Sequence, residues 1–322
     1  MNFDVDLVYL WVDGHDAAWQ RKHDLFVPPK DAAPPDETSF AANADEARFA
    51  DNDELRYSLR SAMLYAPWIR RIFIVTDGQT PRWLDTSHPK IRIVDHTDIL
   101  PPEALPTFNS NVIEHALFRI PGLAEHFLYA NDDTFFNRPV TPADFFTPDG
   151  RPFVRLSRRP LGQVGPWLKY GVAHRPMSHY NRALDNSARL VAKRFGRYVA
   201  HKPHHNIDAY SRSSFEQFHE MFRADLEPTM ANRMRSDNDI QRALYSYAGI
   251  VTGVAVPAFV TRATSFRLHT HKPKHYVHLA RLNPLLFCLN DSEWADNDDR
   301  RRVGLWLRDR FPQRAPWELP EA

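Results

Sequence analysis

An apolar run ends abruptly in one amide and two carboxylates at Phe127-Leu128-Tyr129-Ala130-Asn131-Asp132-Asp133. Consecutive apolar residues of this number are typical of a strand that is buried on both faces. The polar residues that follow would lie at the carboxyl end of the strand, which is the edge where open α/β sheets bind ligands. Adjacent Asp residues also cap helices or end strands with no further role. The motif therefore gains weight only if other strands end in the same way.

Other short apolar runs also end at an aspartate, namely residues 5–12 before Asp13, 71–76 before Asp77 and 91–94 before Asp95. Parallel strands that are buried on both faces produce this pattern. Segments with helical spacing separate the runs, so the chain is predicted to be an α/β protein with right-handed crossovers. We expect one ligand crevice to collect the side chains at the strand ends, Asp13, Asp77, Asp95 and Asp132.

Several segments between and after these runs are predicted to be helical. In residues 53–63, the apolar side chains at 55, 59 and 63 form one stripe, and Asp51 or Asn52 is a suitable N-cap. Asn111 precedes Val112-Ile113-Glu114 in the pattern of a capping box. Residues 189–197 have helical spacing, and a further helix is expected to begin at Ser236 or Asp237. The first amides of that helix, beside Arg235, are either a phosphate-binding corner or an ordinary capped end.

The composition is that of a globular chain of enzyme size. Its 322 residues are 43% hydrophobic, which is enough for a sizeable core in one or two domains. The 41 basic and 40 acidic residues leave a formal charge of +1, so no global positive field points to nucleic acid. No apolar run has the length of a membrane span, and Met1-Asn2-Phe3-Asp4 does not resemble a signal peptide. A lone Cys288 excludes an internal disulfide and fits a reducing cytosol, and we expect this thiol to be buried and inert.

The chain becomes basic and aromatic between residues 155 and 205. Arg158-Arg159, Trp167 and Lys169-Tyr170 lie in this segment. It is either a solvated helical insertion or a basic lid near an anionic ligand, and the charge pattern alone fits both.

Three imidazoles follow within His201-Lys202-Pro203-His204-His205. A structural zinc site is not expected, because the only cysteine is distant in the sequence. Histidines in a loop are commonly surface or core residues. Pro203 restricts the backbone between them, which favours a positioned base.

The motifs resemble the conserved regions of the Stealth proteins, in the order of that family. Residues 11–19 resemble the first region, and residues 52–61 resemble the opening of the second, which continues through 74–79, 105–110 and 127–133. His201-Lys202-Pro203-His204 and residues 235–241 resemble the third region, and Phe287-Cys288-Leu289-Asn290-Asp291 resembles the fourth. The segment after Pro203 is one residue longer than the commoner family spacing. Because the ordered set spans nearly the whole chain, the protein is identified as a member of this family.

The resemblance implies a transfer of sugar-1-phosphate from a nucleotide sugar to a hydroxyl group of another sugar. Family members include bacterial capsule polymerases and the animal enzyme that tags lysosomal glycoproteins. For this chain the resemblance implies a UDP-sugar donor such as UDP-N-acetylglucosamine, a glycan acceptor, and a divalent cation, Mg²⁺ or Mn²⁺. The acceptor hydroxyl would attack the β-phosphorus and UMP would leave.

The fold implied by the resemblance is a mostly parallel, Rossmann-like or glycosyltransferase-A-like sheet flanked by helices, with a basic helical insertion. We expect one catalytic domain over residues 1–322. Residues 1–138 would form the nucleotide-sugar and metal half, and 139–200 the insertion, as a lid or acceptor region. Residues 201–322 would supply the catalytic histidine and arginine and the closing segment.

The resemblance also assigns roles to individual residues. His201 would be the general base, with His204 in reserve, while Arg235 would stabilise the transferring phosphate and Asp13 would complete the catalytic group. The metal ligands would be Asp132 first, then Asn131 and Asp133. The expected substrate-binding residues are Trp11, Gly14, Arg56, Arg60, Asp77, Asn109, Ser110, Glu114, His204, Asp239 and Asn290. Core packing is the alternative for Trp11, and surface salt bridges are the alternative for Arg56 and Arg60.

Two other functions are compatible with the same residues. A metal-dependent glycosyltransferase that releases UDP would use the same kind of acidic strand end. An inactive carbohydrate-binding relative is the third alternative, and the intact set of His201, Arg235 and Asp132 argues against it. We expect a bacterial cytoplasmic enzyme of capsule or exopolysaccharide synthesis, with association at the inner membrane surface through the basic insertion as an alternative.

Overall fold

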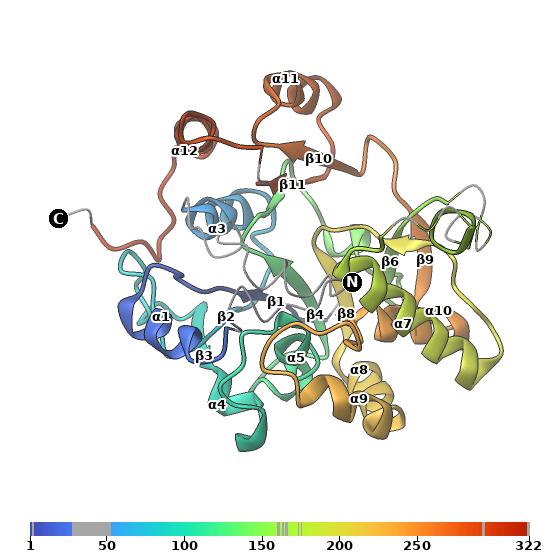
Figure 1. Ribbon diagram of the computed structural model, residues 1–322. Helices are drawn as coiled ribbons and strands as arrows, with labels where there is room; N and C mark the ends of the chain where they lie inside the picture. Colours follow the sequence, from blue (N-terminus) through green and yellow to red (C-terminus); the bar gives the residue numbers. More distant parts are fainter. Residues whose placement is uncertain are drawn as a thin grey trace.

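A five-stranded sheet forms the centre of the molecule, with helices on both of its faces (Figure 1). The computed structural model describes residues 1, 3–27, 53–159, 162, 164, 167–172, 174, 176–291 and 294–320. The strand order is β3-β2-β1-β4-β8, with bounds β1 Val5–Leu10, β2 Ile72–Thr76, β3 Ile91–Asp95, β4 His126–Asn131 and β8 Asp208–Ser211. Strands β1 to β4 are parallel and β8 is antiparallel to β4. The predicted, mostly parallel α/β sheet is confirmed.

Successive residues of the strands face two different hydrophobic layers. Val8, Phe73 and Phe127 belong to the core on one face of the sheet. Leu7, Ile74 and Leu128 belong to the core on the opposite face, where helix α3 (Glu54–Tyr65) contributes buried leucines. Because both faces are covered, the strands are apolar at nearly every position, as expected for parallel strands.

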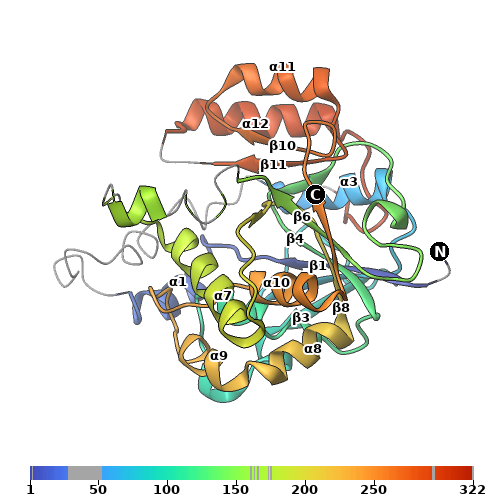
Figure 2. The ribbon, with the colours of Figure 1, turned by 90° about the vertical axis from the view of Figure 1, so that its right-hand side faces the viewer.

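Two smaller sheets lie beside the central one. The second sheet has the order β10-β11-β5, with bounds Ser265–His269, Leu286–Asn290 and Thr134–Phe136. Helices α11 (Pro273–Leu282) and α12 (Asn297–Arg310) lie over this sheet, on the side where α3 covers the central sheet (Figures 1 and 2). The third sheet has the order β7-β6-β9, with bounds Lys202–Pro203, Phe153–Ser157 and Val256–Phe259.

Short helices and turns connect these strands. The remaining helices are α1 (Ala17–Asp24), α4 (His96–Ile99), α5 (Ser110–Glu114), α7 (His179–Phe195), α8 (Arg212–Met221), α9 (Arg223–Met230) and α10 (Ala243–Thr252). Single turns are η3 (Pro102–Ala104), η4 (Leu117–Arg119), η5 (Pro142–Asp144) and the π-helical η6 (Trp167–Val172). No helix in the described ranges is both long enough and apolar enough to cross a membrane.

Three predicted helix starts differ from the structure. Helix α3 has Asp53 at its N-cap position, and the predicted caps Asp51 and Asn52 lie outside the described residues. Asn109, not Asn111, caps α5 by accepting the N–H of Asn111, so the predicted capping box is wrong. No helix begins at residue 236 or 237. That segment is a turn, and α10 starts only at Ala243.

Helix α7 contains residues 189–195 of the stretch predicted to be helical over 189–197, and its C-cap is Gly196, whose φ of 71° suits a glycine. Its inner side buries Leu184, Ala188 and Val191 in the same core as α10. The helix is therefore not a fully solvated insertion, because one side of it is part of the main hydrophobic core.

Two buried histidines share the hydroxyl group of Tyr245 within this core. Nδ1 of His115 lies 2.7 Å from that oxygen, and its Nε2 lies 2.8 Å from the carbonyl oxygen of Ile240. Nδ1 of His219 lies 3.2 Å from the same hydroxyl. Burial lowers the pKa of His115 to about 4 and the pKa of His219 to about 3.

We expect the free energy of unfolding to fall as the pH is lowered from about 6.5 towards 4. In this window the unfolded chain binds protons at His115 and His219 that the folded chain does not bind, so acid favours unfolding. Each histidine contributes a slope of up to ~1.4 kcal/mol per pH unit. Urea unfolding at a series of pH values measures the slope, and His219→Gln should make it shallower. An unchanged slope in that variant would contradict the assignment.

Candidate functional site

The acidic turn, residues 131–133, connects the central sheet to the second sheet. Asn131 ends β4 and is in register with Leu10 of β1, and Thr134 begins β5. The backbone N–H of Leu289 in β11 donates to the carbonyl oxygen of Asp133 at 2.8 Å. The hydroxyl of Ser58 on α3 donates to the carbonyl oxygen of Thr134 at 2.5 Å. Contacts from several elements therefore fix the backbone that carries both carboxylates.

Asp133 forms an ion pair with His205, a residue that was not assigned a role from the sequence. Its Oδ2 atom lies 3.1 Å from Nε2 of His205, and both side chains are about one-quarter exposed. Burial would lower the pKa of His205, but the carboxylate of Asp133 raises that pKa above its ordinary value. Because Nε2–H donates to the carboxylate, Nδ1 is the nitrogen that can accept a proton or a hydrogen bond.

The second oxygen of Asp133, Oδ1, is buried and has no hydrogen-bond partner among the described residues. An unpaired buried oxygen of this kind is compatible with a cation or a ligand donor. Within the described part of the chain, no three His, Cys, Asp or Glu side chains gather closely enough to enclose a metal ion. Mg²⁺ is commonly held by one or two carboxylates and completed by water and phosphate oxygens, and Asp132 with Asp133 fit that mode.

A buried charged network lies on the other side of Asn131. Nη2 of Arg242 donates to Oδ2 of Asp208 at 2.6 Å, and its Nη1 lies 3.5 Å from Oε2 of Glu114. The hydroxyl of Tyr129 donates to Oδ1 of Asn131 at 2.7 Å and lies 3.1 Å from Oε1 of Glu114. Burial raises the pKa of Asp208, although Arg242 and His205 oppose this shift. The network therefore positions the side chain of Asn131 through the hydroxyl of Tyr129.

Arg267 supplies an exposed positive charge on β10. It is opposite Cys288 in the register of β10 and β11. Burial and, next in importance, the positive charge of Arg267 lower the pKa of His204 to about 4. The imidazole of His204 is therefore neutral at neutral pH. Cys288 is buried as expected, and burial together with the nearby Asp133 raises the pKa of its thiol to about 12, which disfavours the reactive thiolate. Arg267 is thus a candidate for binding an anion beside the acidic turn.

His201 occupies a different position from His205. Its Nδ1 accepts the backbone N–H of Arg159 at 3.2 Å, and its ring meets Phe259 edge-on at 4.8 Å between centroids. The hydroxyl of Tyr247 donates to the carbonyl oxygen of His201 at 3.1 Å. In the neutral ring the proton is therefore on Nε2, which makes this nitrogen a donor. His204 has Nδ1 at 3.3 Å from Oγ of Ser265.

Asp239 organises the loop at residues 232–239. Its buried carboxylate accepts hydrogen bonds from Asn109, Asn111, His179, Asn232 and the backbone N–H of Ser236. Burial would raise the pKa of Asp239, but these donors lower it. The side chains of Asn109 and Asp239 are fully buried and bind each other, and their expected substrate contacts stay predictions. The same contacts explain why this segment turns and does not start a helix.

Arg235 and Ser110 remain candidates beside this loop. Nη2 of Arg235 lies 3.2 Å from Oγ of Ser110, and both residues are partly exposed. Their expected roles at the transferring phosphate and the donor stay predictions.

Arg56 and Arg60, which the resemblance places at a phosphate, both bind Glu318 in the structure, and their expected phosphate contacts stay predictions. Arg60 is 4% exposed, and its Nε and Nη2 atoms donate to the two carboxylate oxygens of Glu318 at 2.6 and 2.7 Å. Nε of Arg56 donates to the same carboxylate at 2.8 Å. The two arginines hold the C-terminal segment on α3, in buried rather than surface ion pairs.

Several other residues that were expected to contact the substrate instead contact other residues of the chain. Trp11 is buried in the core around α3, as its alternative predicted, and Glu114 pairs with Arg242 and Tyr129. Asp77 pairs with Lys22 at 2.5 Å. Asp95 caps α4 and accepts the N–H of Gly78 at 2.6 Å.

Three other predicted site residues, Asp13, Gly14 and Asn290, lie near the carboxyl edge of the central sheet or in the second sheet. Oδ1 of Asp13 accepts the N–H of His15 at 2.8 Å. The side-chain amide of Gln79 accepts the backbone N–H of Asp13 and donates to its carbonyl oxygen. The carbonyl oxygen of Gly14 accepts the side chain of Gln20 at 2.8 Å. Oδ1 of Asn290 lies 3.5 Å from Sγ of Cys288. No contact tests their expected roles.

Comparison with known proteins gives two family matches. The model of Stealth protein conserved region 2 matches residues 48–154, and the model of conserved region 1 matches residues 3–26. The third and fourth regions expected from the sequence stay predictions.

Curated relatives match over nearly the whole chain. An exopolysaccharide phosphotransferase of Streptomyces coelicolor is 38% identical over 100% of this chain and 53% of its own length. The exopolysaccharide phosphotransferase CpsY of Mycobacterium tuberculosis is 35% identical over 98% of this chain and 58% of its own. The chain thus spans about half the length of these relatives. The capsular polysaccharide phosphotransferase LcbA of Aeromonas hydrophila is 34% identical over 97% of this chain and 86% of its own.

Solved structures are more distant. The galactosyltransferase LgtC, in complex with donor and acceptor sugar analogues, has a TM-score of 0.46 at 10% identity, over 98% of each chain. Mouse xyloside xylosyltransferase 1 has a TM-score of 0.42 at 12% identity, over 88% of this chain and 97% of its own. The two region matches and the nearly full-length similarity to LcbA show that this chain belongs to the Stealth family.

Proposed function

We propose that the chain transfers sugar-1-phosphate from a nucleotide sugar, probed first as UDP-N-acetylglucosamine, to a hydroxyl group of an acceptor glycan. The observation that carries this proposal is the acidic turn, which presents the unpaired Oδ1 of Asp133 beside His205 and Arg267. Phosphoryl transfer needs a group that orients the nucleophile and cations that stabilise the developing charge. This site combines both requirements at the carboxyl edge of a parallel sheet, where ligands bind in such folds.

The acidic side chains of the site would bind a metal ion, and the basic ones would bind phosphate. Asp132 and Oδ1 of Asp133 would hold a Mg²⁺ or Mn²⁺ ion, which supplies positive charge to the pyrophosphate when bound. Arg267, exposed beside Asp133, would contact a phosphate oxygen, and Arg235 with Ser110 would contact the donor from the loop side. We infer these binding roles from the charge and exposure of the side chains.

The geometry favours His205 over the expected His201 as the general base. His205 donates Nε2–H to Asp133, which fixes the ring and directs Nδ1 to accept the proton of the acceptor hydroxyl. In His201 the acceptor nitrogen already receives the backbone N–H of Arg159. Nε2 of His201 is then a donor, suited to binding a phosphate or hydroxyl oxygen. His204, neutral and bonded to Ser265, is a reserve for the same task.

The released nucleotide tests the proposed function. The chain is incubated with UDP-N-acetylglucosamine, Mg²⁺ or Mn²⁺ and a panel of capsular oligosaccharides, and the products are separated by chromatography. Attack at the β-phosphorus releases UMP and leaves a phosphodiester in the product, detectable by ³¹P NMR. Release of UDP would show attack at the sugar carbon and would overturn the proposal in favour of a glycosyltransferase. Sugar binding with no turnover on any donor would support an inactive relative.

A further inference from the structure

A basic turn, residues 267–275, contains the end of β10, the connection that follows and the start of α11 (Figures 1 and 2). Six of its nine residues are Arg, Lys or His, and none is Asp or Glu. The backbone N–H of Lys272 donates to the carbonyl oxygen of His269 at 3.0 Å, which closes the chain tightly. Arg267 and Lys272 are exposed, and His269 is partly exposed. A ligand can therefore reach these side chains from solvent.

Three imidazole rings gather in the basic turn. The ring centroid of His269 lies 5.8 Å from that of His271 and 5.4 Å from that of His275. Nδ1 of His275 accepts the backbone N–H of His269 at 3.2 Å, which ties α11 to the end of β10. The ring nitrogens of His269 form no hydrogen bond with any described residue. This imidazole therefore keeps its hydrogen-bonding capacity for a ligand.

The positive charges of the basic turn repel one another. Burial lowers the pKa of His269, and the charges of Lys272, His275, Arg267 and His271 lower it further. Burial and Lys272 also lower the pKa of His275. Neither Arg267 nor Lys272 forms an ion pair within the described part of the chain. A bound anion would relieve this repulsion and favour the protonated imidazoles.

The carboxylates of the neighbouring elements are bound to other groups. Oδ2 of Asp291, which follows β11, lies 2.9 Å from Nε of Arg300, and its Oδ1 accepts the hydroxyl of Thr270 at 3.2 Å. Oδ1 of Asp299 on α12 lies 2.9 Å from Nη1 of Arg302. These acids therefore do not balance the charge of the basic turn.

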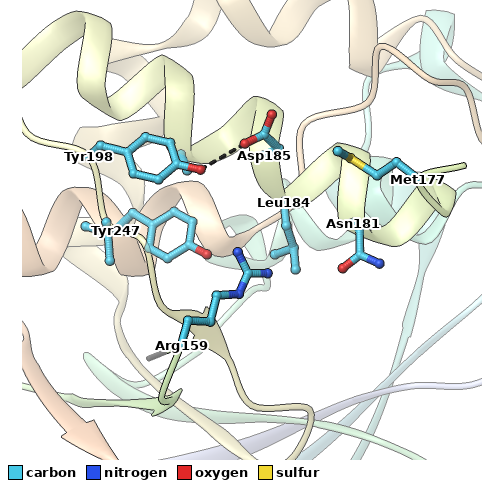
Figure 3. A pocket seen from close by; sticks show the side chains of 9 residues that line it. Arg159, Met177, Asn181, Leu184, Asp185, Tyr198 and Tyr247 are labelled. Carbon is cyan, nitrogen blue, oxygen red and sulfur yellow. Dashed lines mark hydrogen bonds between the residues drawn. The ribbon is translucent and has the colours of Figure 1, made fainter. Parts of the chain in front are cut away.

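The basic residues of α7 show the ordinary alternative for a charged segment. Arg189 binds Asp185 at 2.6 Å, and the other oxygen of that carboxylate accepts the hydroxyl of Tyr198 at 2.9 Å (Figure 3). Arg182 lies 3.2 Å from Asp237. Cations that are matched in this way are typical of a solvated surface. The basic turn differs because its cations are clustered without such partners.

The strand β10 connects the basic turn to the candidate site. Leu268 is buried with Leu279 of α11 in the core below the two outer helices. Arg267 and His269, one residue to either side of Leu268, therefore project from the opposite face of the strand. Their Cα atoms are about 7 Å apart. A ligand that Arg267 holds beside the acidic turn can thus extend to His269.

We propose that the basic turn binds a phosphate group between the imidazole of His269 and the ammonium of Lys272. A doubly charged oxyanion has several acceptor oxygens, which suit an ammonium with three donors and an imidazole that can take up a proton. The phosphate is either free inorganic phosphate or part of a nucleotide that also reaches Arg267. Only the second source rests on the proposed function.

Calorimetric titration with inorganic phosphate at pH 7 tests the site in the unaltered chain and in two variants. Lys272→Gln should weaken binding about tenfold, because a charge-assisted contact is lost. The matched control is Arg281→Gln, which removes an exposed positive charge from the same helix, about 9 Å along α11 from His275. This control should bind phosphate nearly as well as the unaltered chain, and thermal unfolding checks that both variants are folded.

Sulfate tests the part played by the imidazoles, because its charge is the same at pH 6 and pH 8. Binding should be tighter at pH 6, since the anion favours the protonated form of His269. In NMR titrations, sulfate should raise the pKa of the His269 ring, and His269→Gln should make sulfate affinity less dependent on pH. Equal sulfate affinity of the unaltered chain at the two pH values would contradict the proposal.

UDP and uridine distinguish the two sources of the phosphate. If UDP binds more tightly than inorganic phosphate, and Lys272→Gln weakens UDP but not uridine, the phosphate belongs to a nucleotide. If inorganic phosphate binds as tightly as UDP, the site takes the free anion. Unchanged affinity of Lys272→Gln for both anions, or an equal loss in Arg281→Gln, would overturn the proposal. Release of UMP without phosphate binding at this turn would leave the proposed function standing, and phosphate binding without UMP release would leave only the turn.

Discussion

Loss of either side chain of the Asp133–His205 pair is expected to reduce sugar-phosphate transfer by about a hundredfold or more. In Asp133→Asn the carboxylate that fixes His205 and offers an unpaired oxygen is replaced by a neutral amide. In His205→Gln the proton acceptor is removed, while a group that can still donate to Asp133 remains. Steady-state kcat with UDP-N-acetylglucosamine and acceptor measures the loss, and circular dichroism confirms that both variants are folded.

Two substitutions give this prediction its controls. His201→Gln retains a donor and should cost less than His205→Gln, because the ring of His201 has its acceptor nitrogen bound to Arg159. Asp132→Asn, assayed over a range of Mg²⁺ concentrations, should raise the concentration needed for half-maximal activity. If His201→Gln abolished transfer and His205→Gln left kcat unchanged, the base would be His201, as the family resemblance implied.

The largest effect on stability is expected for Arg242→Met. This buried guanidinium lies between the carboxylates of Asp208 and Glu114, with the ring of Tyr129 at 4.4 Å from its central carbon. Removing it leaves two buried carboxylates without their cation, which should lower the free energy of unfolding by about 3–5 kcal/mol. Urea unfolding at neutral pH measures the change.

Arg189→Gln is the matched control for Arg242→Met. Arg189 forms an ion pair with Asp185 on the surface of α7, where its side chain is 75% exposed. Exposed pairs of this kind contribute about 0–1 kcal/mol. If both variants were destabilised equally, burial of the Arg242 network would not be the reason for its contribution.

The central sheet was predictable because its strands are buried on both faces. Burial leaves continuous apolar runs, and an aspartate after each run marks the carboxyl edge. The helix starts predicted near Asn111 and Ser236 were wrong. The side chain of Asn111 and the backbone N–H of Ser236 both donate to the carboxylate of Asp239. Asp239 is more than one hundred residues away from Asn111, so the local sequence pattern around Asn111 could not predict that contact.

In the candidate site, too, local sequence predicted some residues, whereas contacts between distant segments determined others. Asp133 followed from its place after a strand, whereas the choice between His201 and His205 depends on which ring reaches that carboxylate. The only signal in the sequence was that the segment after Pro203 is one residue longer than the commoner family spacing. The sequence around Arg267 did not indicate a role for it, because the register of β10 against β11 is what brings it to the site. Arg56 and Arg60 had the spacing of a phosphate-binding pair but meet Glu318, a partner 262 and 258 residues away.

Helix α3 connects two parts of the molecule that are far apart in the chain. Ser58 and Ser61 on this helix hold the backbone of β5, immediately after the acidic turn, while Arg56 and Arg60 grip Glu318. The carboxylates of the turn and the closing segment therefore share one rigid support. A substitution at Glu318 would therefore disturb α3 and, through Ser58 and Ser61, the backbone next to the candidate site.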